Sequence, residues 1–320
     1  MTGGAGFVGS HYVRSVLGDA WGSERPDSVV VLDKLTYAGD PANLAPVHDD
    51  PRLRLVVGDI VDGDLVRRLT SGVDAVVHFA AESHVDRSIE HAAAFVTTNV
   101  LGTQTLLDAA RESGVERFVH VSTDEVYGSI DVGAWDEQAR LDPSSPYSAS
   151  KAASDLLALA AHRTHGLPVS LTRCSNNYGP YQLPEKLVPL FLTRLIDGGP
   201  LPLYGDGRNV RDWLHVDDHC RAVHLVLTRG SPGEVYNVGG GQPQTNRELT
   251  ARLLAAFGAG WDRVVPVPDR LGHDRRYCVD ATKIRTTLGF APRVGFEEGL
   301  AETVAWYREH RTWWEPLIRR

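Results

Sequence analysis

The residue types best suited to chemistry lie between residues 122 and 151. Tyr147 and Lys151 have the spacing Y-x-x-x-K, so on a helix their side chains would project from one face. A lysine ammonium beside a phenol favours the phenolate and lowers a pKa that is otherwise about 10. This pair therefore predicts a tyrosine that acts as a base near neutral pH.

Two adjacent carboxylates, Asp124 and Glu125, follow Ser122 and Thr123. Two carboxyl groups that face one substrate can divide acid and base work, because their repulsion raises the pKa of one of them. Together with the tyrosine and lysine, they indicate redox chemistry coupled to proton transfer. The alternative is a pair of surface carboxylates in a loop.

A glycine-rich segment, TGGAGFVG at residues 2–9, matches both G-x-x-G-x-x-G and G-x-G-x-x-G. Glycines let a backbone approach a pyrophosphate, whose charge the N-terminus of the following helix would meet. A helix is expected over 8–18 and a buried strand over 28–33, which ends in Asp33. Asp33 would accept hydrogen bonds from ribose hydroxyls and repel a 2′-phosphate, which favours NAD over NADP. A simple glycine turn is the alternative.

Strands and helices alternate along the chain, which predicts an α/β fold: a Rossmann-type doubly wound parallel sheet with a smaller C-terminal lobe. Further strands are expected at 53–58, 75–79, 118–121, 169–172 and 235–238, and helices at 62–70, 99–113, 147–165, 216–227 and 296–310. The NAD-binding domain is expected at 1–174 plus 211–240, and a second, ligand-binding domain at 175–210 plus 241–320, where prolines become frequent. Trp313 and Trp314 are expected to pack the end of the last helix as core residues rather than to face a ligand.

A strand is expected before the glycine segment of such a sheet, yet only Met1 precedes Thr2. We expect a start codon assigned a few residues late or a trimmed terminus, with an inactive protein as the alternative.

The composition bounds the classes of function. The chain has 320 residues, 42% of them hydrophobic, and a net charge of −8. A substantial core is expected, and the acidic balance argues against a nucleic-acid partner. No apolar run approaches the roughly 20 residues that cross a bilayer. Three distant cysteines, Cys174, Cys220 and Cys278, fit a reduced cytoplasmic protein better than a disulfide framework, and His78 and His84 lack partners for a zinc site.

The motifs TGGAGFVGSH, HFAAESHVDRSI, VSTDEVYG, PYSASKAASD, RCSNNYGPYQ and NVRDWLHVDDHC occur in this order. They resemble those of dTDP-glucose 4,6-dehydratases, which are extended short-chain dehydrogenase/reductases. The resemblance covers essentially the whole chain and is closest to bacterial enzymes that supply deoxysugars for antibiotics or cell-surface glycans. It implies a cytoplasmic, NAD-dependent homodimer that acts on dTDP-glucose, with the helices at 99–113 and 147–165 in the dimer interface.

The resemblance also implies a role for each chemical group. Tyr147 would remove the 4-hydroxyl proton as hydride leaves C4, Lys151 would hold the ribose and lower the pKa of the tyrosine, and Thr123 would bind the 4-oxygen. Glu125 would then take the C5 proton, and Asp124 would protonate the departing 6-hydroxyl. Hydride returns to C6, so NAD is regenerated.

The remaining expected site residues follow the family pattern. The cofactor contacts are expected at Gly3, Gly6, Phe7, Val8, Gly9, Asp33, Lys34, Thr36, Ala38, Gly39, Asp59, Ile60, Phe79, Ala80, Ala81, Ser83, Thr98, Val121, Tyr147, Lys151, Cys174 and Asn177. The substrate contacts are expected at Ser83, Thr123, Asp124, Glu125, Tyr147, Asn176, Glu185, Lys186, Leu187, Pro202, Leu203, Tyr204, Arg211, Asn246, Arg270, His273 and Tyr277. Lys186 and Arg211 would meet the diphosphate, and Leu203 and Tyr204 the thymine. Asp59 would meet the adenine amine, or would cap a helix instead.

Three other functions stay open. A 4,6-dehydratase of a CDP-, GDP- or UDP-hexose would share the same chemistry. A sugar-nucleotide C4 epimerase shares the glycine segment, tyrosine and lysine, but resembles S-S-A-x-V-Y-G where this chain has Thr123-Asp124-Glu125, which favours dehydration. A non-catalytic NAD-binding scaffold is the third.

Overall fold

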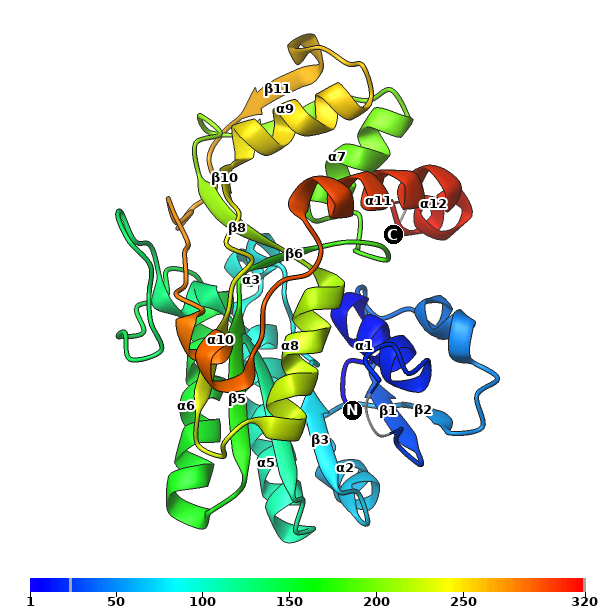
Figure 1. The fold of residues 1–320 in the computed structure, drawn as a ribbon, viewed down its shortest axis with the longest axis vertical. Coiled ribbons are helices and arrows are strands. Elements are labelled where there is room, and N and C mark those ends of the chain that lie inside the picture. Colours follow the sequence, from blue (N-terminus) through cyan, green and yellow to red (C-terminus); the bar gives the residue numbers. More distant parts are fainter. Residues whose placement is uncertain (23–24, 319–320) are drawn as a thin grey trace.

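A parallel β-sheet organises the larger lobe of the protein (Figure 1). The computed structural model describes residues 1–22 and 25–318. The strand order is β2-β1, then Thr2, then β3-β4-β5-β9, and every neighbouring pair is parallel. These strands are β1 (Val29–Asp33), β2 (Leu53–Val57), β3 (Ala75–His78), β4 (Arg117–Thr123), β5 (Val169–Cys174) and β9 (Val235–Val238). The predicted doubly wound parallel sheet is confirmed.

Thr2 occupies the centre of this sheet. It forms parallel bridges to Leu32 in β1 and to His78 in β3. The Thr2 amide donates to the Val77 carbonyl at 3.1 Å, and the Gly3 amide donates to the Leu32 carbonyl at 2.9 Å. A strand was expected before the glycine segment. In the described residues, Thr2 occupies its position in the sheet. The strand order reverses here, and open α/β sheets bind ligands at this point of reversal, beyond the carboxyl ends of the strands.

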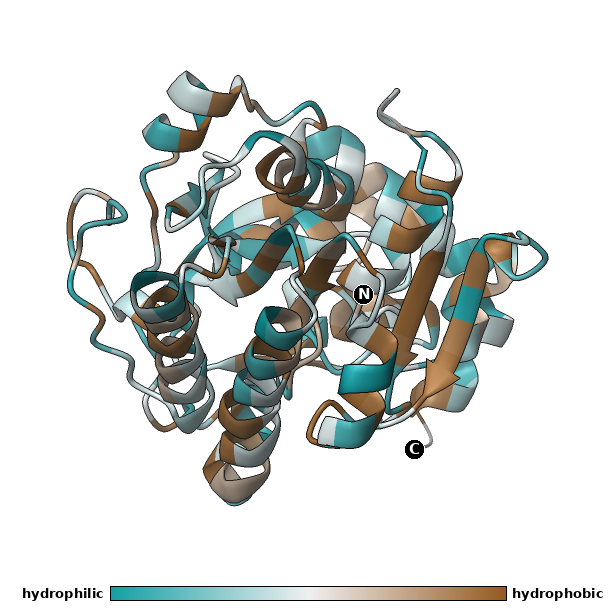
Figure 2. Ribbon diagram, turned by 90° about the horizontal axis from the view of Figure 1, so that it is seen from below, coloured by the Kyte–Doolittle hydropathy of each residue, from teal (hydrophilic) through white to brown (hydrophobic). Residues whose placement is uncertain are grey.

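Helices cover both faces of the sheet. On one face, α1 (Phe7–Leu17) and α8 (Val216–Arg229) bury Tyr12, Val13 and Val223 against β1, β3 and β4. On the other face, α2 (Gly63–Thr70), α5 (Thr103–Glu112) and α6 (Pro146–His165) bury Leu106 and Ala158 against the same sheet. The strands are hydrophobic along most of their length, as burial on both faces requires (Figure 2).

The smaller lobe has two small sheets and its own core. One sheet contains β6 (Asn176–Tyr178), β8 (Val210–His215) and β10 (Pro243–Thr245), and the other pairs β7 (Leu201–Tyr204) with β11 (Val264–Val267). The helices are α7 (Leu187–Ile196), α9 (Asn246–Ala256), α11 (Phe296–Glu309) and α12 (Arg311–Ile318). They enclose an apolar cluster that includes Phe191, Trp213, Leu253, Tyr307 and Trp314.

The expected strands and helices match the structure to within a few residues. Two elements, however, pack in a different lobe from the one expected. β8 pairs with β6 and β10, so the strand on which the expected domain boundary at residue 211 falls lies in the sheet of the smaller lobe. By contrast, α10 (Thr282–Leu288) returns to the larger lobe, where Ile284 joins the core around α8.

Several short elements were not expected from the sequence. The 99–113 helix starts earlier, as the π-helix η2 (Val96–Gly102), before α5. The short helices η1 (Pro41–Val47), α3 (Val85–Glu90), α4 (Ala92–Phe95), η3 (Asp124–Tyr127) and η4 (Trp261–Arg263) complete the described fold. None of the helices in the described residues combines the length and the apolar character that crossing a membrane requires.

Candidate active site

The glycine segment forms a tight turn between Thr2 and the start of α1. Gly3 has a φ of +67°, and a Cβ there would lie 2.6 Å from the Ala80 nitrogen. A Cβ on Gly9 would lie 2.1 Å from the Gly3 carbonyl oxygen. Side chains are therefore excluded at both positions. The turn places the free backbone amides at the start of α1 at the edge of the cavity, where they suit a pyrophosphate.

Asp33 ends β1 beside this turn and is buried. Its two carboxylate oxygens accept from the Ala5 amide and the Leu35 amide, each at 2.9 Å. These bonds fix the carboxylate at the rim of the cavity, where the sequence predicted ribose recognition.

Asp59 lies next to this carboxylate in the cavity wall and pairs with Lys34 at 2.6 Å. Its alternative role as a helix cap is wrong, because Asp62 accepts from the Leu65 amide and caps α2.

The helix α6 carries Tyr147 and Lys151 into the cavity. A capping box of Ser145 and Ser148 fixes its first turn, and Pro146 stands where a helix needs no amide hydrogen. Lys151 is 4% exposed, and its ammonium donates to the Val121 carbonyl at 2.8 Å. The Tyr147 ring is held by an edge-on contact with Phe95.

The pKa of Tyr147 is raised rather than lowered in this structure. Burial is the main cause, and the charge of Glu125 adds to it, whereas a hydrogen bond with Thr123 acts in the opposite direction. Burial also lowers the pKa of Lys151, to about 8, although the charge of Asp155 opposes the fall. The expected fall in the pKa of Tyr147 is therefore not seen among the charges of the protein itself, while the expected contribution of a bound nicotinamide stays a prediction.

Asp124 and Glu125 begin η3, directly beyond the carboxyl end of β4. Thr123 caps this short helix, because its hydroxyl accepts from the Glu125 amide at 3.2 Å. The same hydroxyl lies 3.4 Å from one Asp124 oxygen, and the other Asp124 oxygen is buried without a hydrogen-bond partner among the described residues. The two carboxyl groups are therefore not a solvated surface pair.

Both carboxyl groups hold protons more tightly than usual. Burial raises the pKa of Asp124 well above its ordinary value, and the charge of Glu125 raises it further. Burial also raises the pKa of Glu125, whereas the charges of Arg211 and Lys186 lower it. The site thus holds one carboxyl that favours the acid form strongly, beside one whose neighbours favour the carboxylate.

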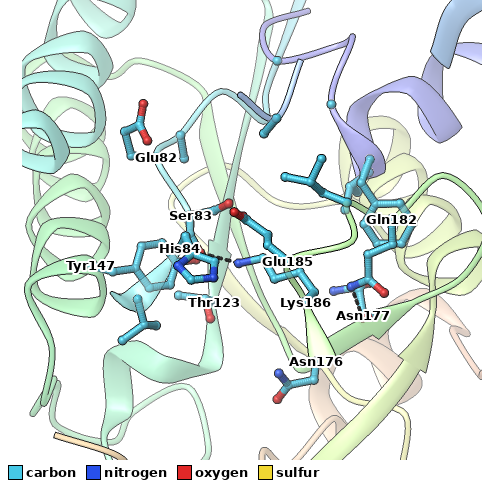
Figure 3. Close-up of a pocket in the computed structure, with 18 of the residues that line it drawn as sticks. Glu82, Ser83, His84, Thr123, Tyr147, Asn176, Asn177, Gln182, Glu185 and Lys186 are labelled. Carbon is cyan, nitrogen blue, oxygen red and sulfur yellow. Dashed lines mark hydrogen bonds between the residues drawn. The ribbon is translucent and has the colours of Figure 1, made fainter. Parts of the chain in front are cut away.

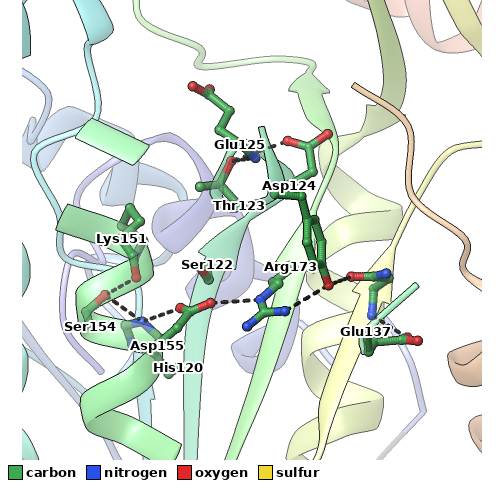
Figure 4. A network of polar contacts seen from close by, with 12 residues as sticks. His120, Ser122, Thr123, Asp124, Glu125, Glu137, Lys151, Ser154, Asp155 and Arg173 are labelled. Carbon is green, nitrogen blue, oxygen red and sulfur yellow. Dashed lines mark hydrogen bonds and ion pairs between the residues drawn. The ribbon is translucent and has the colours of Figure 1, made fainter. Parts of the chain in front are cut away.

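A buried polar network lies beneath these groups (Figure 4). Asp155, one turn beyond Lys151, pairs with Arg173 at 2.8 Å and lies 3.3 Å from the His120 ring. Arg173 donates to the Tyr127 hydroxyl at 2.9 Å. Burial raises the pKa of Asp155, but the hydrogen bond from His120 and the charge of Arg173 bring it to about 2. Asp155 therefore remains an anion next to Lys151.

The opposite wall comes from the smaller lobe (Figure 3). The Lys186 ammonium donates to the Ser83 carbonyl at 2.7 Å and so connects the two lobes. Arg211 is buried, with its guanidinium over the Tyr277 ring at 4.2 Å, and donates to the Asp274 carbonyl. Arg270 donates to Asp86 at 2.8 Å and lies over the Tyr204 ring. The charges of these three cations all act to lower the pKa of Glu125.

A single cavity contains every residue that the sequence predicted for cofactor, substrate and catalysis. It brings the glycine segment, Asp33, the tyrosine and lysine, the carboxyl pair and the three cations to one surface. The roles of the individual residues remain predictions. Burial raises the pKa of the Cys174 thiol to about 12, so this cysteine contributes as a neutral group. No group of histidine, cysteine and acidic side chains in the described part of the chain could hold a metal ion.

Several lining or supporting residues were missed. Asn99 accepts from the Glu82 amide and donates to Ser150, so it ties the 80–84 loop to α6. Asn43, Gln182 and Trp313 also line the cavity. The interpretation of the two tryptophans is right for Trp314, which is fully buried, but incomplete for Trp313. The sequence carries no local signal for these missed residues, because their positions depend on contacts between distant segments.

The fold and site define an α/β protein that pairs a dinucleotide-type glycine turn with a tyrosine–lysine site and two adjacent carboxyl groups, one buried and one half-buried. The family model described as GDP-mannose 4,6 dehydratase matches residues 1–303, and the chain belongs to this family.

Individual relatives give closer matches. The chain is 62% identical over 321 residues to a dTDP-glucose 4,6-dehydratase of Streptomyces antibioticus, covering 100% of this chain and 95% of that one. It is similar to the structure of DesIV, a dTDP-glucose 4,6-dehydratase from Streptomyces venezuelae solved with NAD bound, with a TM-score of 0.98, 64% identity and coverage of 99% and 98%. A UDP-glucose 4-epimerase from Thermotoga maritima gives a TM-score of 0.88, 32% identity and coverage of 96% and 97%.

The raised pKa of Asp124 predicts a pH-dependent cost to stability. Between the ordinary value of about 3.9 and the folded value, the unfolded chain releases a proton that the folded protein keeps, so stability falls as pH rises. Asp124→Asn removes this titration, and a tenfold difference in proton affinity between the folded and unfolded chain corresponds to ~1.4 kcal/mol. We expect the melting temperature of the variant to exceed that of the wild type by ~3 °C or more at pH 8, and the gain to shrink toward pH 4.

Differential scanning fluorimetry across this pH range measures the gain. Asp131→Asn, which changes an exposed carboxylate on the following loop, is the matched control and should give no such trend. A difference between Asp124→Asn and wild type that is the same at every pH would contradict the account of Asp124.

Proposed function

We propose that this protein catalyses the NAD-dependent dehydration of dTDP-glucose to dTDP-4-keto-6-deoxyglucose. The observation that carries the proposal is the carboxyl pair of buried Asp124 and half-buried Glu125 in the same cavity as Tyr147, Lys151 and the glycine turn. Oxidation alone needs only the tyrosine and lysine, whereas elimination of water needs an acid and a base in addition.

The residues of the larger lobe fit a dinucleotide. The glycine turn and the start of α1 suit the pyrophosphate, and Asp33 suits ribose hydroxyls. NAD, when bound, supplies a hydride acceptor for C4 and returns the hydride to C6. The DesIV structure, solved with NAD, supports this cofactor.

Tyr147 accepts the proton of the 4-hydroxyl. Burial opposes ionisation of its phenol, so the positive charges of Lys151 and of a nicotinamide ring are needed to stabilise the phenolate. Thr123, which bonds to Tyr147, is placed to hold the 4-oxygen at the same time. The base is therefore active only when cofactor and lysine are both in place.

Asp124 and Glu125 then carry out the elimination. The 4-ketone acidifies the C5 hydrogen, which Glu125 removes as a carboxylate favoured by Arg211 and Lys186. Asp124 gives its proton to the 6-hydroxyl as it leaves, and burial keeps that proton on Asp124 until then. As hydride returns to C6, Glu125 gives its proton back to C5. The pKa is raised more for Asp124 than for Glu125, which suits the acid and the base role respectively.

The smaller lobe suits the nucleotide diphosphate. Lys186 offers a point charge and Arg211 a planar fork, which are the two ways that proteins bind phosphate oxygens. Tyr204 and Leu203 offer a face for the base. Relatives at 61% and 62% identity are named dTDP-glucose 4,6-dehydratases, which supports thymidine over other bases.

The second candidate is C4 epimerisation, which the similarity to the UDP-glucose 4-epimerase structure favours. Incubation of the purified protein with dTDP-glucose distinguishes the two. A dehydratase forms a 4-keto-6-deoxy sugar, an epimerase forms dTDP-galactose, and a scaffold forms neither.

The protein is further proposed to be a homodimer. Val96 and Leu101 on η2 and Leu156 on α6 are more than half exposed, on helices that pack side by side. Exposed aliphatic side chains grouped in this way suit burial against a second copy. The three cysteines are free thiols, which supports a reducing, cytoplasmic location.

Tyr147→Phe should reduce turnover of dTDP-glucose by roughly 10²–10⁴-fold, because the base that drives oxidation is removed. The rate of C4 oxidation, followed as the absorbance of reduced nicotinamide in a single turnover, should fall equally. Tyr236→Phe is the control, since this phenol binds the Ser231 amide outside the cavity. Near-normal oxidation in Tyr147→Phe would reject the assignment.

Asp124→Asn should spare C4 oxidation and slow the loss of the 6-hydroxyl by ~10²-fold or more, because asparagine cannot supply the proton. Reduced cofactor and the 4-keto hexose should therefore accumulate, while exchange of the C5 hydrogen with deuterated water continues through Glu125. Rapid quench and mass spectrometry measure both. Unchanged elimination would show that Asp124 is not the acid.

Leu101→Glu combined with Leu156→Glu should convert the dimer to a monomer, because two charges would be buried in the interface. Light scattering after gel filtration measures the mass. Val132→Glu, on an exposed loop, is the control and should leave the dimer intact. A doubly substituted chain that stays dimeric would place the interface elsewhere.

A further inference from the structure

The helix α12, near the far end of the chain (Figure 1), contacts η1, the short helix that bonds to the glycine turn. The Trp313 indole donates to the Asn43 side-chain oxygen at 2.9 Å. The Asn43 amide group in turn donates to the Ala5 carbonyl at 2.8 Å. Asn43 is 2% exposed, so the bonds are shielded from water. Two hydrogen bonds thus connect the C-terminal helix to the turn that suits the pyrophosphate.

The same tryptophan packs against the loop that follows β6. Its ring meets the Tyr181 ring at 5.5 Å, and the Arg14 guanidinium of α1 lies over the Tyr181 ring at 4.2 Å. Arg14 also donates to the Asn43 carbonyl. Tyr181 has a φ of +68°, a backbone conformation that residues other than glycine rarely adopt because it is strained. The packing must therefore hold this loop in place.

A second connection runs from α11 to the same loop. The Tyr307 hydroxyl donates to the Gln182 carbonyl. The Gln182 side chain donates to the Asn177 carbonyl at 2.8 Å. Trp314 anchors the start of α12, because its buried indole donates to the Tyr307 carbonyl at 2.7 Å. The C-terminal helices therefore bond to the cavity wall at two places, Asn43 and Gln182.

We propose that Trp313 and Asn43 form a latch that closes the C-terminal helix over the dinucleotide and slows its release. Asn43, Tyr181 and Trp313 line the same cavity as Gly3, Gly6 and Asp33. Both latch residues are positioning residues, since they act through Ala5 and the glycine turn rather than on reacting atoms. The inference rests on the proposed function, in which NAD is regenerated in every cycle and need not leave.

Trp313→Phe removes the indole donor and keeps an aromatic ring at this position. Loss of one neutral hydrogen bond predicts release of NADH about two- to tenfold faster. Stopped-flow fluorescence measures the rate after the NADH-loaded enzyme is mixed with excess NAD. The matched control is Trp306→Phe, which alters the same aromatic cluster without touching Asn43 and should leave the rate unchanged.

Asn43→Ala should accelerate release at least as much as Trp313→Phe, and the double variant should be no faster than Asn43→Ala alone, because both act through one connection. Amide hydrogen exchange of residues 3–9 should rise in both single variants, also without cofactor. An unchanged release rate together with unchanged exchange would overturn the latch. If the wild type bound no NADH, the proposed function would fail, and the exchange of residues 3–9 would still decide on the latch.

Discussion

The side chains at the carboxyl edge of the large sheet are shielded from water, and the chemistry depends on this desolvation. Burial raises the pKa values of Asp124 and Tyr147 together. For the elimination this effect is an advantage, because the acid must hold its proton until the hydroxyl leaves. For the oxidation it is an obstacle, because the phenol must ionise. The site therefore needs positive charge beside Tyr147, to stabilise the phenolate. Beside Asp124, any positive charge must be too weak to ionise the carboxyl group.

The buried network below the site meets the first of these needs, which is positive charge beside Tyr147. A buried lysine tends to lose its charge, and Asp155 opposes that tendency from the next turn of α6. Asp155 is itself held as an anion by His120 and Arg173. Buried ion pairs seldom add much stability, but removal of one partner leaves an uncompensated charge. We therefore interpret this network as support for the ammonium of Lys151 rather than as a source of stability.

Local pattern was enough to predict much of this arrangement. The glycine segment, the carboxylate at the end of β1 and the Y-x-x-x-K pair are short-range features, and the helix expected at 147–165 is α6, Pro146–His165. The features that the sequence did not predict depend on contacts between distant segments. The pairing of β8 with β6 and β10 and the contact of Trp313 with Asn43, 270 residues apart, leave no periodic signal in the sequence. The expected fall in the pKa of Tyr147 was not found for a related reason, since burial is a property of the whole cavity.

The comparison with epimerases shows why the fold alone cannot decide the reaction. A UDP-glucose 4-epimerase structure matches with a TM-score of 0.88 at 32% identity, so the fold is common to both. The argument for dehydration therefore rests on side chains, above all on Asp124 and Glu125, which begin η3 beyond the end of β4. One oxygen of Asp124 is buried without a partner among the described residues, so desolvation and the charge of Glu125, rather than a hydrogen-bond acceptor, hold its proton. An acid kept protonated in this way can release its proton to a departing hydroxyl without first breaking a strong hydrogen bond.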